Sequence, residues 1–458
     1  MSTSQSAQLA PRPAIAPPRP YVFPAVRRSE VDGGQILAAH LPGQPIVWLS
    51  LLLGGGALRE PAGLDGLARA TAGLLDEGSV NYTADEFGTL VESLGGNWSV
   101  DTGWETARLS IDLPVAEAVA GAGMLAEAAH RPAFTDHDVE RYLADLVAGK
   151  RESFARPGPR AQAAFRGALF GAETRFGRLA GGDPDTTAAL TAEAVRAFHA
   201  DWLRDAGTLL VVGDLDQVDL AELGHTVFGE QPGRVVSATA PSPLGRPTLA
   251  ADPARLVIAD RPGAVQSTLR IGHTTPTMAE AIEEGLDRVA LRVASSILGG
   301  SFTSRLNHEL REVKGYTYGA RGAFDLGRPV GFYQFSAEVR TDATGDAIDD
   351  TLRVMSEFLD GGVTPEELEK TRSHLAGAIP IELQTVHSVG HYLVDIVRQG
   401  LPDDFVTTDH AHLLAVTLDE VNTAIRRTLR TEDLVIAVEG DESAIALDPD
   451  RYAPKSTN

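Results

Sequence analysis

The second half of this 458-residue chain repeats the order of sequence features found in the first half. Helix starts marked by Thr, with acidic residues in the following turn, and strand ends marked by Gly-Asp recur at a nearly constant spacing. The corresponding pairs are Thr135 and Thr364 (offset 229), Thr191 and Thr417 (226), and Gly213 and Gly440 (227). Such an offset indicates an internal duplication, so the sequence predicts two domains of one fold. The alternative is two unrelated domains that share common cap motifs.

Each repeat combines apolar strands, such as residues 47–53 and 267–272, with capped helices, which indicates an α+β fold. The stretch 231–247 is rich in Pro, Ser and Gly and predicts a linker between the two domains. In chain order we expect a flexible N-terminal arm (1–22), an N-terminal domain (23–230), the linker (231–247), a C-terminal domain (248–446) and a tail (447–458).

Composition excludes several classes of function. The chain has 40 basic and 63 acidic residues, and its net charge of -23 disfavours binding to nucleic acid or to an anionic membrane surface. There is no cysteine, which excludes disulfides, thiol catalysis and cysteine metal sites. The N-terminus lacks the pattern of a secretory signal, and the longest apolar stretch is far shorter than the roughly 20 residues that cross a bilayer. We therefore expect a cytoplasmic protein without membrane contact.

Residues 60–79 read E-P-A-G-L-D-G-L-A-R-A-T-A-G-L-L-D-E-G-S. This segment resembles the zinc helix of the pitrilysin/insulinase family of zinc peptidases, in which Gly-apolar-Ala precedes H-x-x-E-H and Gly-Ser or Gly-Thr closes the segment. There the two His share a helix face and bind zinc, and the Glu is the base for the attacking water. The resemblance covers nearly the whole chain. It implies two homologous domains, each a mainly antiparallel sheet packed with helices, which form half of a clam-shaped peptidase.

The zinc ligands themselves are missing from this segment. Aligned on its flanking residues, the two His positions fall at Arg69 and Gly73 and the Glu position at Ala72. Arg keeps its proton, and neither Ala nor Gly offers a ligand atom. The third ligand of the family, a Glu on a later helix, falls at Gly149, although Glu152 lies only three residues away. The sequence therefore predicts an Ala/Gly-rich helix packed against a neighbour, with no metal in this chain.

A second family segment is present. Residues 301–323 read S-F-T-S-R-L-N-H-E-L-R-E-V-K-G-Y-T-Y-G-A-R-G-A and resemble the family's S-R-L-x-x-x-L-R-E followed by Gly and a strand Tyr. A helix from about Thr303 to Lys314 is expected, with Arg311 in its last turn, followed by a strand that places Tyr316 and Tyr318 on one face. By chemistry alone, such a pair is usually a charge at a helix end and a half-buried aromatic. The resemblance implies instead that Arg311 and Tyr318 hydrogen-bond a peptide carbonyl and its oxyanion.

Together the two segments imply a non-catalytic, substrate-binding subunit of a heterodimeric zinc metallopeptidase. A homologous H-x-x-E-H-bearing partner would hold the zinc, and the enclosed peptide would add as a strand to an exposed sheet edge, in the partner. This chain alone is expected to have no peptidase activity. The alternative is a non-proteolytic structural or peptide-binding scaffold protein, because the family resemblance also extends to non-catalytic core subunits of respiratory complexes.

One further pattern has metal-ligand spacing. His387 and His391 are four residues apart and could bind a metal on a helix, but the position of a general base between them is Gly390. Surface or inter-helix histidines are the alternative, and the same holds for Asp409, His410 and His412, which are close in sequence.

Overall fold

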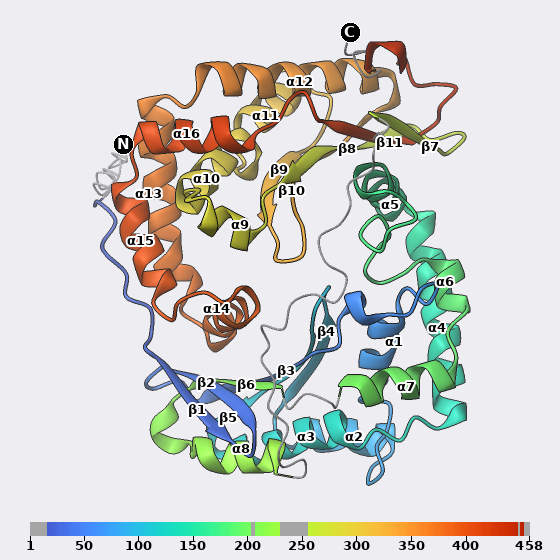
Figure 1. The fold of residues 1–458 in the computed structure, drawn as a ribbon, viewed down its shortest axis with the longest axis vertical. Coiled ribbons are helices and arrows are strands. Elements are labelled where there is room, and N and C mark those ends of the chain that lie inside the picture. Colours follow the sequence, from blue (N-terminus) through green and yellow to red (C-terminus); the bar gives the residue numbers. More distant parts are fainter. Residues whose placement is uncertain (1–15, 203–206, 230–254, 448, 453–458) are drawn as a thin grey trace, which may run out of the picture.

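A computed structural model describes residues 16–202, 207–229, 255–447 and 449–452, with two sheets at opposite ends of the molecule (Figure 1). The expected linker 231–247 and the first 15 residues of the expected arm lie outside the described residues. Further along, the backbone N–H of Tyr21 donates to His410 Nδ1 (3.1 Å) and that of Phe23 to Thr407 Oγ1 (3.0 Å). The start of the described chain is thus held by a helix near its end.

The first half of the chain forms a six-stranded sheet in the order β1-β2-β6-β3-β5-β4. Its strands are β1 (Val26–Val31), β2 (Gly34–His40), β3 (Ile46–Leu53), β4 (Asn97–Thr102), β5 (Ala107–Pro114) and β6 (Thr208–Gly213). Its helices are α1 (Leu67–Gly73), α2 (Ala84–Ser93), α3 (Ala118–His130), α4 (Asp136–Ala155), α5 (Pro157–Phe170), α6 (Pro184–Ala188), α7 (Ala192–Trp202) and α8 (Leu220–Phe228). Strand β3 is apolar and buried on both faces because helices cover both sides of the sheet.

The second half forms a five-stranded sheet in the order β7-β11-β8-β10-β9. Its strands are β7 (Leu256–Asp260), β8 (Gln266–Thr275), β9 (Ala320–Leu326), β10 (Gly331–Arg340) and β11 (Val435–Gly440). Its helices are α9 (Met278–Glu283), α10 (Arg288–Ser295), α11 (Arg305–Asn307), α12 (Thr344–Gly361), α13 (Pro365–Glu382), α14 (Val386–Gln399), α15 (Phe405–Ala415) and α16 (Leu418–Thr428). Two π-helical segments, 296–300 and 308–313, extend α10 and α11.

The two sheets have the same topology once β1 is set aside. Strands β2 and β6 pair in parallel, as β7 and β11 do, and every other neighbouring pair is antiparallel in both sheets. Thr135 and Thr364 cap the corresponding helices α4 and α13. The predicted fold class, two homologous α+β domains with mainly antiparallel sheets, is confirmed.

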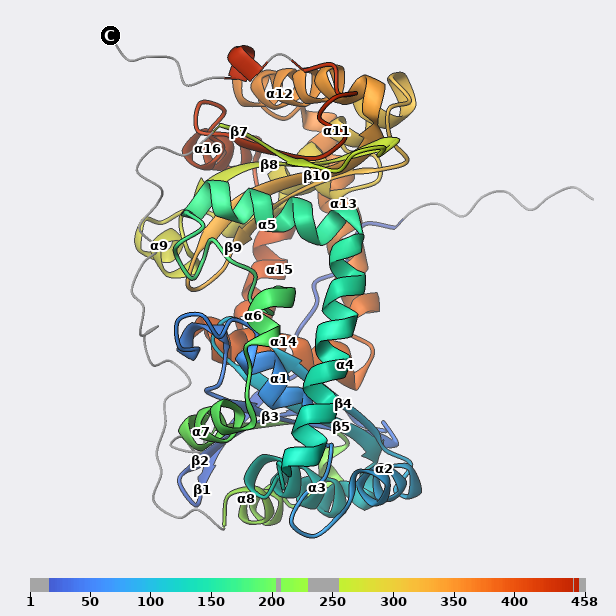
Figure 2. The ribbon, with the colours of Figure 1, turned by 90° about the vertical axis from the view of Figure 1, so that its right-hand side faces the viewer.

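The two halves exchange helices. Helix α5, from the first half, packs on β11, β8 and β7 of the second sheet, and α14, from the second half, packs on β6, β3 and β2 of the first. Figures 1 and 2 show that α4 and α13 run between the ends of the molecule. Helix α4 leads into α5, and α13 leads into α14. Gly390 in α14 approaches β3 so closely that a Cβ there would lie 2.4 Å from the Trp48 ring. Each sheet is therefore completed by the other half of the chain.

Among the described residues, no helix is both long and apolar enough to cross a membrane.

Candidate functional site

Helix α1 contains positions 69–73, at which the sequence resemblance predicts the family's zinc-binding motif. Its small side chains Ala68, Ala70 and Ala72 are buried, which lets the helix pack closely against α7 and the edge strand β4. The predicted Ala/Gly-rich packed helix is confirmed, although it is short and ends at Gly73. Its first turn is capped from outside, because Glu60 Oε1 accepts hydrogen bonds from the backbone N–H groups of Gly66 (3.1 Å) and Ala68 (2.8 Å).

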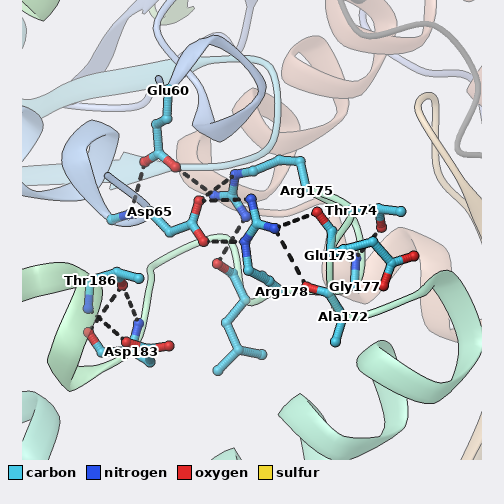
Figure 3. A network of polar contacts seen from close by, with 12 residues as sticks. Glu60, Asp65, Ala172, Glu173, Thr174, Arg175, Gly177, Arg178, Asp183 and Thr186 are labelled. Carbon is cyan, nitrogen blue, oxygen red and sulfur yellow. Dashed lines mark hydrogen bonds and ion pairs between the residues drawn. The ribbon is translucent and has the colours of Figure 1, made fainter. Parts of the chain in front are cut away.

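A buried ionic network fixes this end of α1 (Figure 3). Arg175 Nη2 donates to Glu60 Oε2 at 2.6 Å, and Arg175 Nε lies 3.4 Å from Asp65 Oδ1. Arg178 forms the second ion pair with Asp65. The remaining Arg175 donors reach the carbonyl oxygens of residues 57, 179 and 180 at 3.0–3.1 Å. Burial raises the pKa of Glu60 to about 7, although Arg175 acts in the opposite direction.

The four positions of the lost metal site do not form a metal site. Arg69 is exposed on α1, Ala72 is buried, and Gly149 is exposed on α4 with no atom within 4 Å of a Cβ built there. At Gly73, a built Cβ would lie 1.8 Å from Tyr142 Oη. The phenol of Tyr142 therefore fills the space of a ligand side chain, and neither this nor the guanidinium of Arg69 suits zinc.

The Tyr142 contact predicts the effect of adding a single methyl group. We expect Gly73→Ala to destabilise the protein by about 1–3 kcal/mol, because the methyl group and the Tyr142 hydroxyl cannot share one space. Helix propensity alone would favour Ala by up to about 1 kcal/mol. A loss of stability in Gly73→Ala would therefore identify the steric clash with Tyr142 as its cause. Urea denaturation measures the difference.

The matched control is Gly149→Ala, which meets no atom and should stabilise α4 by about 0.5–1 kcal/mol. Tyr142→Ala should remove most of the penalty of Gly73→Ala in a double-mutant cycle. A Gly73→Ala protein as stable as the parent would contradict the proposed clash.

The structure places Arg311 in the last turn of the predicted helix, which ends at Gly315 with φ 65°. The turn is π-helical rather than α-helical, a form often found at functional sites. The Arg311 guanidinium lies over the Phe302 ring, 4.2 Å from its centroid. Its Nε is 3.6 Å from Glu312 Oε1, and its buried Nη1 has no hydrogen-bond partner among the described residues.

The expected strand placement of the two tyrosines is wrong. Strand β9 begins only at Ala320, so Tyr316 and Tyr318 lie in the segment before it. Thr317 Oγ1 accepts from Gly319 N–H (3.1 Å) and makes a local turn, while Arg340 N–H donates to the Tyr316 carbonyl (3.4 Å). As a result Tyr316 is half-buried and Tyr318 is 96% exposed.

Tyr318 stands at the mouth of a cavity of about 530 Å³. Its lining includes Phe302, Tyr318, Arg270, Asn307, Arg321 and Glu338. Phe302 therefore lies between the cavity and Arg311, because it lines the cavity and its ring contacts the Arg311 guanidinium. Sequence reasoning did not find Phe302 or Tyr142, because stacking and space filling depend on tertiary packing.

The histidine pair is a contact between the halves. His387 Nε2 lies 3.3 Å from Asp112 Oδ1, and both His387 and His391 face the Trp48 ring. The described residues that cluster with metal-ligand geometry are elsewhere: His40, Asp214 and Asp216, and Asp287, His412 and Glu420. Of their carboxylates, those of Asp214, Asp287 and Glu420 already accept backbone N–H groups as turn or helix caps.

Comparison with known proteins agrees with this fold. A family model described as "Peptidase M16 inactive domain" matches residues 189–375. An uncharacterized zinc protease of Mycobacterium leprae is 24% identical over 79% of this chain and 80% of its own length. A non-peptidase homolog of Helicobacter pylori is 22% identical over 84% of this chain and 86% of its own. Among solved structures, a peptidase M16 inactive domain from Pseudomonas fluorescens superposes with a TM-score of 0.81 at 22% identity, covering 92% of this chain and all of that one.

The duplicated sheets agree with the fold of the solved peptidase M16 structures. In fold and sequence the chain is similar to members of the peptidase M16 family, the pitrilysin/insulinase family that its sequence resembles, among them a protein named as a non-peptidase homolog.

Proposed function

We propose that this chain is the non-catalytic, substrate-binding subunit of a heterodimeric zinc metallopeptidase that cleaves peptides or unfolded protein segments. A homologous partner bearing H-x-x-E-H holds the zinc, and this chain supplies Arg311 and Tyr318 to that site. The peptide lies between the two subunits and adds as a strand to a sheet edge of the partner.

The observation that carries the proposal is the state of Arg311 and Tyr318. A Tyr that is 96% exposed makes no packing contribution that would explain its position. The Arg311 guanidinium lies over the Phe302 ring, 4.2 Å from its centroid, and its Nη1 has no hydrogen-bond partner in the described part of the chain. Both groups have the donors that a peptide carbonyl and a developing oxyanion require.

Co-expression with a family member that carries H-x-x-E-H tests the proposal. The purified mixture should cleave an unstructured peptide, neither chain alone should do so, and a chelator should abolish the activity. Cleavage by this chain alone, with a firmly bound zinc, would contradict the proposal directly.

A non-proteolytic scaffold is the second candidate, and the printed name of the Helicobacter pylori relative, a non-peptidase homolog, favours it. It predicts a stable complex or peptide binding with no cleavage under any combination of chains, so the same experiment separates the two functions.

A further inference from the structure

Basic side chains gather where the family's zinc site has been lost. Arg69 projects from α1 and Lys150 from α4, and both reach the loop before α6. A Cβ built on Gly181 would lie 3.4 Å from Arg69 Cδ and 3.0 Å from Lys150 Nζ, so the two side chains flank one point of this loop. Lys150 Nζ donates to the Gly182 carbonyl at 3.3 Å, which fixes its position. Tyr142 on α4, whose hydroxyl lies against Gly73, is within electrostatic range of Arg69 and adds a hydroxyl on that side of it.

No ion pair within the described chain neutralises the charge of Arg69, whereas Glu60 and Asp183 attract the Lys150 ammonium electrostatically. Arg69 is exposed, and among the described residues it makes no hydrogen bond or ion pair. In a chain with a net charge of -23, an arginine without a carboxylate partner beside a half-buried lysine is unexpected. Arg69 and Lys150 repel each other electrostatically, and Glu60 and Asp183 offset this repulsion only at Lys150, so an anionic ligand beside Arg69 would relieve it.

The nearby carboxylates already have other partners. Glu60 is bound by Arg175 and by two backbone N–H groups of α1. Asp183 caps α6 by accepting from the backbone N–H groups of Asp185 (2.9 Å) and Thr186 (2.8 Å), as Figure 3 shows. Glu77 is paired with Arg141 on the outer side of α4. None of these carboxylates lies within ion-pair distance of Arg69.

We propose that Arg69, Lys150 and Tyr142 form a binding site for the carboxylate of a peptide. The guanidinium fork matches a carboxylate, the ammonium adds a point charge, and the phenol hydroxyl donates a third hydrogen bond. The inference rests on the proposed function for the identity of the ligand as a peptide. In this site Arg69 of α1 presents its positive charge to the peptide from a helix that lacks the zinc ligands. The carboxylate is either the peptide's C-terminus or an Asp or Glu side chain.

Peptide binding to the isolated full-length chain tests this inference without any partner subunit. The probes are fluorescein-labelled, unstructured decapeptides of one neutral sequence in three forms: a free C-terminal carboxylate, a C-terminal amide, and a C-terminal amide with one internal Glu. Fluorescence polarisation at low salt should show at least about tenfold tighter binding for a carboxylate-bearing form than for the neutral amide. The form that gains affinity identifies the source of the carboxylate.

Arg69→Gln and Lys150→Gln should each remove most of this preference, and Tyr142→Phe should reduce it severalfold. Arg426→Gln is the matched control, because Arg426 is an exposed arginine on α16 and its loss should change nothing. Added salt should weaken the preference in the parent protein but not in Arg69→Gln.

Equal affinity for all three peptides, or a preference that survives Arg69→Gln, would overturn the inference and leave the proposed function intact. Binding of none of the peptides would overturn both the inference and the peptide-binding role of the isolated chain.

Discussion

Arg311→Ala is expected to lower kcat/KM of the reconstituted two-chain peptidase about 100- to 1,000-fold. A donor aimed at the developing oxyanion acts in the transition state, and removal of one such donor typically has an effect of this size. Tyr318→Phe should act similarly, because it deletes only the hydroxyl of a side chain that is otherwise exposed. Initial rates of peptide cleavage at several substrate concentrations give the measurement.

Two controls accompany this prediction. Tyr316→Phe removes a hydroxyl two residues away from Tyr318, and Arg426→Ala removes an exposed arginine on α16. Neither should change kcat/KM more than about twofold. Folding of Arg311→Ala is checked by its thermal midpoint. Unchanged rates in both site variants would leave this chain only a scaffolding role.

The largest effect on stability is expected at Arg175. Arg175→Met should destabilise the protein by about 3–5 kcal/mol, because it leaves Glu60 without its ion-pair partner in a buried site and removes three hydrogen bonds to backbone carbonyls. Thermal denaturation measures this loss, with Arg156→Met as the control. Arg156→Met breaks an ion pair with Glu152 in which both side chains are more than 70% exposed, so it should destabilise the protein by at most about 1 kcal/mol.

The same variant has a defined pH dependence. The pKa of Glu60 is about 7 in the folded protein against 4.5 in the reference state, so the folded protein binds more protons between these values. The contribution of Glu60 to stability is therefore highest below pH 4.5 and falls as pH rises through 7. Because Arg175 lowers this pKa, Arg175→Met should raise it further.

The deficit of Arg175→Met should therefore be larger at pH 8 than at pH 5.5, where Glu60 can be protonated in the variant. Glu60→Gln keeps an acceptor for the N–H groups of α1. When Arg175→Met is introduced into a Glu60→Gln protein, its stability deficit should be the same at pH 8 and pH 5.5. A deficit independent of pH would mean that Glu60 is not the group left unpaired.

Sequence alone predicted the duplicated fold because its signals are local. The caps at Thr135 and Thr364 and the strand ends at Gly213 and Gly440 depend on hydrogen bonds within a few residues and on short-range apolar pattern, so their order survives in the structure. The absence of zinc ligands at positions 69 and 73 could also be predicted from the sequence. The two ligand positions of the motif are four residues apart because they lie one helical turn apart, so the pattern is local.

What the sequence did not predict depends on contacts between distant segments. The Tyr142 hydroxyl occupies the ligand space at Gly73 from 69 positions later in the chain, and no local pattern records this. The segment around Tyr318 was expected to be a strand because the family segment that it resembles has a strand Tyr after the helix-ending Gly, here Gly315. Thr317 and Gly319 form a turn, and the Arg340 N–H donates a hydrogen bond to the Tyr316 carbonyl, so strand β9 begins only at Ala320.

The exchange of α5 and α14 has a consequence for biosynthesis. On the inner face of the first sheet, around Trp48, helix α14 packs over β2, β3 and β6 and ends at Gln399. Since a ribosome releases the chain from the N-terminus, this apolar face, whose strand β6 ends at Gly213, stays open while the 186 residues up to Gln399 are made. The nascent protein therefore requires protection from aggregation, by a holdase chaperone or by rapid elongation, until nearly the whole polypeptide has emerged.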